Sequence, residues 1–274
     1  MKNIKKIIYL FFLLIIFNTG FAAADTSDAP DAPDTVEIQE KAAHSRVGIG
    51  IGYLFAGYRE ETDIPLNRYV HTFAFALDGN FEKGRLLYSF NSNFIFGKNK
   101  AIEINSNENY FTYYQKESNF IKVSLENSLD YRLWGNNALP GYLGGALRCD
   151  VYFTHLPQTF YYNLTGIISL DIHLTQKWII NDKNTFAVSA SIPVLGFGIR
   201  PPYYGLLYTP LDLTMSFVSL HNYWAIFCHV KYEYKLTRLI SFYSNLGFEF
   251  SHINFPQPRR DASIRINAGV SFIF

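Results

Sequence analysis

Apolar and polar residues alternate along most of this chain, and the alternation is clearest at its end. From residue 264 to residue 274 every second position is apolar, namely Ile264, Ile266, Ala268, Val270, Phe272 and Phe274. The residues between them are small or polar, except Ile273. Successive side chains of a β-strand point to opposite faces, so a period of two predicts a strand with one apolar and one polar face.

The same period recurs in nine earlier segments, at about 47–55, 73–78, 86–96, 121–132, 143–154, 168–175, 186–194, 224–235 and 242–250. Their polar faces carry mainly Gly, Ser, Asn and Thr with scattered charges of both signs. The polar face of a soluble β-sandwich would instead be rich in Lys and Glu. A face of small polar residues fits the interior of a narrow barrel. We therefore predict an all-β fold, an antiparallel up-and-down transmembrane β-barrel with an even strand number, ten or twelve.

The strand number stays open because of residues 211–220. Apolar residues alternate well there, at Leu211, Leu213, Met215 and Phe217. An even number is required if both ends of the barrel lie in the same compartment. Either this segment belongs to an outer loop, which gives ten strands, or it pairs with a second irregular strand from about 98–116 or 203–209, which gives twelve.

The start of the chain differs from the rest in composition. Residues 1–24 combine a short basic start, an apolar run over 7–17 and small residues before Asp25, which predicts a cleaved secretory signal peptide. The apolar run is shorter than the roughly 18–20 residues of a spanning helix. Residues 25–45 are rich in Asp, Ala and Pro and predict a disordered periplasmic linker. The barrel is then expected over 46–274.

Composition agrees with a membrane barrel. The chain is 49% hydrophobic and contains 25 Phe and 20 Tyr, which a lipid-facing band with two aromatic girdles would accommodate. The formal charge of +1 gives no support for nucleic-acid binding. Cys149 and Cys228 fall at outward positions of strands that are not neighbours, so we expect no disulfide between them.

The last strand also carries a spaced motif, in which Asn267, Gly269, Phe272 and Phe274 follow the order polar-x-Gly-x-x-Phe-x-Phe. This order resembles the C-terminal signal of bacterial outer-membrane β-barrel proteins. The resemblance implies a Gram-negative outer membrane as the location, with outer-membrane lipids and the barrel assembly machinery as partners. The chain is also similar in size and class to outer-membrane phospholipase A.

The catalytic motif of that phospholipase is missing. It requires a His with a Ser two residues later, and His155 is not followed by such a Ser. His252 has Ser251 before it rather than a Ser after it, and Ser219 precedes His221 by two positions. We therefore expect no complete catalytic set. A lipid-modifying hydrolase that uses Ser219 with His221, or His252 with Ser251, remains an alternative.

Charged residues fall on the polar faces of several predicted strands. We expect the following side chains to line the lumen: Lys122, Glu126, Asp130, Arg132, Arg148, Asp150, Asp171, His173, His229, Lys231, Glu233, Glu249 and Arg265. Charges in a narrow lumen are tolerated only when they are paired or hydrated. They predict either a salt-bridged interior that plugs the barrel or a polar lining that passes or binds a small solute. Asp171 and His173 are only a pair, so no metal or other cofactor is expected.

These observations favour an integral outer-membrane barrel that works as a small channel or as a solute-binding or ligand-binding barrel of unknown substrate. The lipid-modifying hydrolase is one alternative. A structural or adhesive barrel with a plugged lumen is the other. A small solute or a lipid is the ligand to expect.

Overall fold

The computed structural model describes residues 45–60, 66–101, 118–155, 162–200, 214–255 and 258–274. Eleven strands form within these residues: β1 (Ser45–Glu60), β2 (Leu66–Lys83), β3 (Leu86–Ala101), β4 (Ser118–Trp134), β5 (Gly141–His155), β6 (Tyr162–Ile179), β7 (Asn184–Arg200), β8 (Thr214–Ser219), β9 (Tyr223–Lys235), β10 (Ile240–Asn254) and β11 (Pro258–Ile273). Among the described residues, no helix is long and apolar enough to cross a membrane. The predicted signal peptide (1–24) and nearly all of the predicted linker (25–45) lie outside them.

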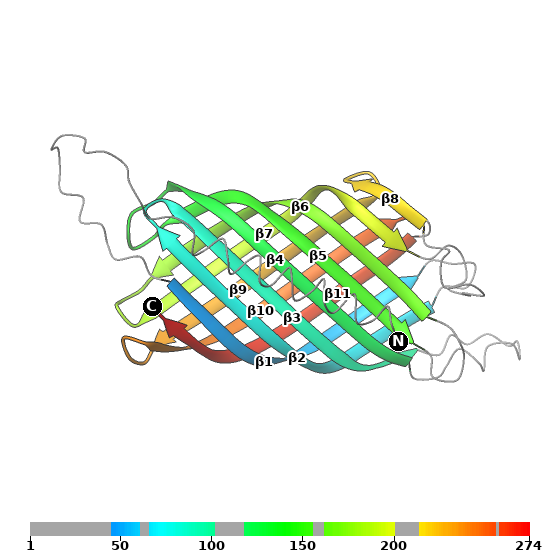
Figure 1. Cartoon of the computed structure of the whole chain (residues 1–274), viewed down its shortest axis with the longest axis horizontal. Coiled ribbons are helices and arrows are strands. Elements are labelled where there is room, and N and C mark those ends of the chain that lie inside the picture. Colours follow the sequence, from blue (N-terminus) through cyan, green and yellow to red (C-terminus); the bar gives the residue numbers. More distant parts are fainter. Residues whose placement is uncertain (1–44, 61–65, 102–117, 156–161, 201–213, 256–257) are drawn as a thin grey trace, which may run out of the picture. The chain divides into compact units, whose positions relative to one another are not determined.

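Ten of these strands close into an antiparallel barrel, drawn with strongly tilted strands in Figure 1. Each strand pairs with the next along the chain, except that β7 is followed by β9 in the barrel. The first and last strands close the ring, with Arg46 opposite Ile273 and Glu60 opposite Arg259. The predicted fold class is confirmed with ten strands, and the twelve-strand alternative is wrong.

The irregular segment near residue 215 shares a position in the barrel with β9. Strand β8 pairs with the second part of β7, where Ser219 lies opposite Leu195. Strand β9 pairs with the first part of β7, where Phe227 lies opposite Ser191. Both run antiparallel to β7, so β9 continues the line of β8 after residues 220–222. An eleventh strand is therefore compatible with a ring of ten.

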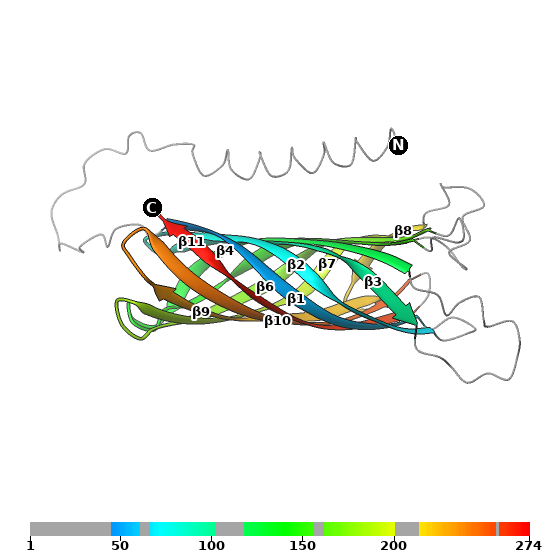
Figure 2. The same ribbon diagram turned by 90° about the horizontal axis from the view of Figure 1, so that it is seen from below.

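The two ends of the barrel differ in their connections. The start of β1 and the end of β11 lie at one end, together with the turns 84–85, 135–140, 180–183 and 236–239; we name it the turn end. Strand β8 lies at the opposite end, which we name the loop end (Figures 1 and 2).

The outward face of the barrel is apolar. Large side chains there are strongly exposed, for example Ile51 (67%), Phe73 (73%), Ile192 (47%) and Phe217 (62%). The outward positions of the described strands carry no Asp or Glu. An apolar surface of this extent is unsuited to water and matches the lipid-facing band of a membrane barrel. Cys149 and Cys228 are free thiols on β5 and β9, as the sequence indicated.

Small residues on β1 make room for a ring from β10, two strands away in the barrel. A Cβ atom added to Gly48 would lie 2.8 Å from the ring of Tyr243, which is 4% exposed. Tyr243 is on β10 and lies directly opposite Gly269 of β11. The glycine face of β1 is therefore the inward face, and it accommodates a bulky side chain rather than open space.

Candidate functional site in the barrel lumen

The interior of the barrel is filled by its own side chains. Inward-facing residues from all levels have almost no exposed surface, for example Asp130 (1%), Tyr142 (0%), Phe227 (2%) and Asn267 (1%). Side chains along an open channel would be exposed to water. At these residues, the described part of the lumen is therefore packed with side chains rather than open to water.

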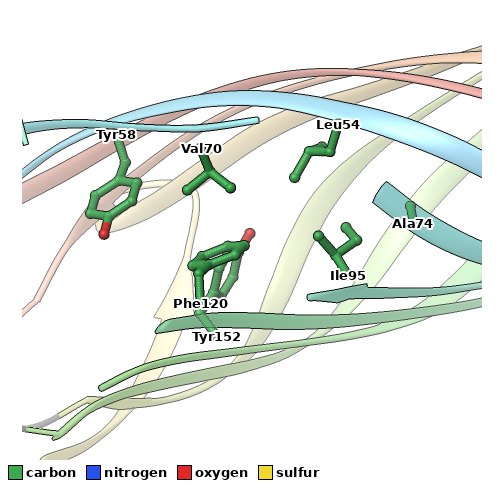
Figure 3. Close-up of a cluster of buried hydrophobic side chains, with 7 residues drawn as sticks. All are labelled: Leu54, Tyr58, Val70, Ala74, Ile95, Phe120 and Tyr152. Carbon is green, nitrogen blue, oxygen red and sulfur yellow. The ribbon is translucent and has the colours of Figure 1, made fainter. Parts of the chain in front are cut away.

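Two apolar clusters occupy the loop-end half of the lumen. The first contains Leu54, Tyr58, Val70, Ala74, Ile95, Phe120 and Tyr152 from β1 to β5, and Figure 3 shows these side chains pointing toward one another. The second contains Ile167, Val218, Tyr223, Ala225, Phe227, Ile253 and Phe255, on the wall formed by β6 and β8 to β10. Within each cluster the packed apolar side chains exclude water.

Below these clusters, one carboxylate joins opposite walls of the barrel. Glu249 on β10 accepts from Lys122 Nζ of β4 at 2.5 Å and from the Tyr152 hydroxyl of β5 at 2.8 Å. Its neighbour Ser263 on β11 also donates to it, at 3.3 Å. We name this group of four residues the Glu249 strut. Because β4 and β10 are separated by four strands along either side of the ring, the strut spans the lumen.

Arg148 on β5 is the centre of a second network. Its guanidinium forms an ion pair with Glu126 and another with Asp171, the latter at 3.1 Å. It also donates to the hydroxyl of Ser191 at 2.8 Å and lies 3.5 Å from the ring centre of Phe227. A guanidinium held by two carboxylates and a ring is fully occupied by the protein.

Paired charges continue toward the turn end. His173 Nδ1 lies 2.9 Å from Asp130. Arg46 forms ion pairs with Asp78 and Glu233, and Lys231 of β9 crosses the lumen to Asp78 of β2. Here too the charges are satisfied within the protein.

Glu82 on β2 repeats the chemistry of Glu249. It accepts from Lys177 Nζ at 2.9 Å and from the Tyr142 hydroxyl at 2.5 Å. Its side chain is 31% exposed, against 13% for Glu249.

A small polar cavity lies beside these networks. Its volume is about 20 Å³, and its lining includes Ser124, Glu126, His229, Glu249 and Arg265. Ser124 Oγ and His229 Nδ1 are buried without a hydrogen-bond partner. A space of this size holds about one water molecule, which would satisfy such atoms. Within the described ranges, no group of three or more His, Cys, Asp or Glu is arranged to hold a metal ion.

Of the charged residues expected in the lumen, Arg132 lies at the turn end, where it donates to Asn137 at 3.1 Å. The other twelve occupy inward positions, and Asp150 is 2% exposed. Sequence reasoning missed Arg46, Asp78, Glu82, Lys177, Arg259 and Asp261, which also occupy inward positions. Their place on the polar face of an alternating strand was the signal that could have found them.

The two serine–histidine pairs that a hydrolase could use differ in the structure. Ser219 Oγ and His221 Nδ1 are hydrogen-bonded in the exposed turn between β8 and β9. The side chain of Asn222 is engaged elsewhere, since its oxygen accepts from Ser219 N and its nitrogen donates to Phe217 O. The pairing of Ser251 with His252 is wrong, because adjacent strand residues face opposite ways. Ser251 is buried inside and donates to Asp261 at 3.4 Å, whereas His252 occupies an outward position.

The four residues of the C-terminal motif divide between the two faces of β11. Asn267 and Gly269 occupy inward positions, and Asn267 is buried. Phe272 and Phe274 are outward, with 48% and 72% of their surface exposed. The Phe274 N–H donates to Ser45 O at 2.8 Å, which ties the last residue to the first strand.

Neither a family model nor a curated protein matches this chain. Among solved structures, the chain is similar to the outer membrane protease OmpT from Escherichia coli, with a TM-score of 0.55 and 8% identity over 88% of this chain and 99% of that one. Neisserial surface protein A has a TM-score of 0.37 and 11% identity, covering 84% and 97%. An outer membrane channel from Pseudomonas putida F1 has a TM-score of 0.38 and 12% identity, covering 89% and 100%. The likeness concerns the fold, which is that of a bacterial outer-membrane β-barrel.

Proposed function

We propose that this chain is an integral outer-membrane β-barrel with a closed lumen, which acts as a structural or binding barrel through its outer surface and its loop end. The observation that carries the proposal is the Glu249 strut, which crosses the lumen beneath two apolar clusters. The apolar outward face and the C-terminal motif support the outer membrane as its location.

A conducting pore would require a different interior. Ions and small solutes pass barrels along hydrated polar walls. In this lumen the Lys122–Glu249 and Lys231–Asp78 pairs cross the path, and both apolar clusters would have to separate. Breaking a buried pair leaves an uncompensated charge, at a cost of about 3–5 kcal/mol. The plugged barrel is therefore favoured over the small channel.

Conductance of the refolded protein in planar bilayers tests this proposal. We expect no current steps across a range of salt concentrations and voltages, while a general porin in the same bilayers conducts. Discrete steps from the wild-type protein would establish a channel. Fractionation of expressing cells tests the location, since the folded chain should be recovered with the outer membrane and shift its gel mobility on heating.

A lipid-ester hydrolase is a second candidate, favoured by the hydrogen bond between Ser219 and His221. A histidine that accepts the proton of a serine hydroxyl activates it as a nucleophile. The pair lies beside Phe217 and Leu220, which are 62% and 55% exposed. Release of fatty acid from phospholipid vesicles should then be lost in Ser219→Ala and in His221→Ala. Equal background release by all three proteins would exclude this activity.

A further inference from the structure

The small polar cavity beside the Glu249 strut is formed by residues from both sides of the ring. Ser124 of β4 lines one side, whereas His229 of β9, Gly247 of β10 and Arg265 of β11 line the other. Strands β4 and β9 are separated by three strands in one direction around the ring and by five in the other. Every lining residue belongs to a strand that the structure describes, so the cavity is defined without the loops.

Gly247 interrupts a row of polar side chains on the inward face of β10. Its neighbours on that face are Asn245 and Glu249. A Cβ atom added to Gly247 would lie 3.3 Å from Nδ1 of His229 and 3.4 Å from Nη2 of Arg265. Because glycine has no side chain, these two nitrogens approach one common point of the cavity wall.

The polar atoms that face the cavity require a hydrogen-bond partner. Ser124 is 6% exposed, and its Oγ and the Nδ1 of His229 have no partner within the protein. Arg265 is 7% exposed and is fixed by Asn93, whose amide oxygen, when turned toward it, accepts from both terminal nitrogens at 3.1 and 3.2 Å. Each terminal nitrogen of a guanidinium carries a second N–H, so Arg265 can still donate into the cavity. Buried polar groups left unpaired destabilise a protein.

The charges of the lining favour a neutral ligand. Two carboxylates, Glu126 and Glu249, and two guanidinium groups, Arg148 and Arg265, face the same space. An anion would meet both carboxylates and a cation would meet both guanidinium groups, whereas a water molecule can donate to one kind and accept from the other. The volume of about 20 Å³ exceeds the roughly 10–15 Å³ that one water requires.

We propose that this cavity is a binding site for a single water molecule that joins opposite walls of the barrel. The water accepts from Arg265 Nη2 and bridges His229 Nδ1 of β9 to Ser124 Oγ of β4. It is therefore a second link across the lumen, beside the Glu249 strut, and it needs no direct contact between the side chains. Gly247 provides the space for it. This inference concerns the interior and does not depend on what the barrel binds at its surface.

A crystal structure of the full chain, grown in sodium bromide, identifies the ligand directly. We expect one oxygen-sized peak within about 3.2 Å of His229 Nδ1 and of Ser124 Oγ, without anomalous signal at the bromine edge. An anomalous peak at this point would show a halide ion and overturn the assignment. So would the absence of any peak between the two side chains.

Two substitutions at Gly247 separate the hydrogen bonds of the water from the space that it fills. In Gly247→Ser the hydroxyl takes the place of the water and bonds to the same groups. In Gly247→Ala a methyl group takes that place and leaves them unpaired. In urea unfolding of the refolded proteins, we expect the unfolding equilibrium constant of the alanine variant to exceed that of the serine variant by about tenfold or more.

Gly166 on β6 is the matched control, because a Cβ atom added there has no other atom within 4 Å. A hydroxyl gains no partner at this position, so Gly166→Ser should be no more stable than Gly166→Ala. Equal stability of the two variants at Gly247, or the same order of stability as at Gly166, would contradict the bridging water. The heat-induced gel shift verifies that each variant is folded, and conductance reports separately on the closed lumen.

Discussion

Removing the carboxylate of the Glu249 strut should destabilise the barrel strongly. In Glu249→Ala, the ammonium of Lys122 and the hydroxyl of Tyr152 both lose their acceptor. The side chain of Lys122 is 4% exposed, so water does not replace the lost partner. Leaving one member of a buried pair uncompensated costs about 3–5 kcal/mol, and we expect the free energy of unfolding to fall by that amount.

Glu82 supplies a matched control, because it accepts from a lysine and a tyrosine in the same way. The variant Glu82→Ala frees Lys177 and Tyr142, but at a site where the carboxylate side chain is 31% exposed. Water and salt screen a pair of this exposure, so its loss should cost only about 1–2 kcal/mol. The difference between the two alanine variants isolates the effect of burial.

A double replacement separates the penalty of an unpaired charge from the net contribution of the pair. In Lys122→Met combined with Glu249→Leu, both members of the pair are removed together, and Tyr152 and Ser263 each lose a hydrogen bond. Replacing buried ion pairs by apolar residues of similar volume is often neutral or stabilising. We therefore expect this protein to be far more stable than Glu249→Ala and close to the wild type.

Urea unfolding of the refolded proteins in lipid vesicles, followed by tryptophan fluorescence, gives the three free energies. The slope of the free energy of unfolding against urea concentration should be the same in all variants, because the surface exposed on unfolding is nearly unchanged. A loss below about 1 kcal/mol in Glu249→Ala, on the scale of exposed pairs, would refute the strut as a buried cross-lumen interaction. So would equal losses in the two alanine variants.

Three further predictions concern packing and assembly. Replacing Phe274 by Asp should impair insertion into the outer membrane, measured as the fraction of heat-shifting barrel; normal assembly would count against the C-terminal signal. Ile95→Ala should lower the free energy of unfolding by about 2–5 kcal/mol, because it opens a cavity in the first apolar cluster, whereas Ile51→Ala on the outward face should cost less. Gly48→Val should cost about 1–3 kcal/mol by overpacking against Tyr243, and wild-type stability of this variant would mean that the ring does not lie there.

The sequence predicted the barrel well because alternation is a local property. Each strand shows its two faces within about ten residues, and no long-range information is needed to read them. Local alternation is also what failed near residue 200. Strand β7 continues to Arg200, but the register shift opposite Leu170 and Asp171 moves its outward apolar positions from even numbers, such as Ile192, to odd numbers, such as Leu195. Strand β8 covers only Thr214–Ser219. Which part of β7 pairs with β8 and which with β9 depends on contacts between distant segments, and no local pattern encodes these contacts.

For the candidate site, the sequence predicted only the face of the strand on which each side chain lies. Alternation places Lys122 and Glu249 on inward faces, but they are 127 residues apart in sequence. Their contact depends on how the ring closes and on the stagger between strands. The apolar clusters escaped prediction for another reason. Near the loop end, residues such as Leu54 and Phe120 face inward and are as apolar as their outward neighbours, so the contrast between faces disappears.

The irregular position of β8 gives a reason for an apolar interior at the loop end. The ladder hydrogen bonds of β7 pass from β9 to β8 beyond Ser191, while the first residues of β9 pair with β10. Side-chain packing therefore has to join β8 to β9 at this level. Val218 and Tyr223, on either side of the junction, are 0% and 2% exposed within the second apolar cluster. This cluster keeps water from the backbone groups at the junction and fills the lumen beside β8.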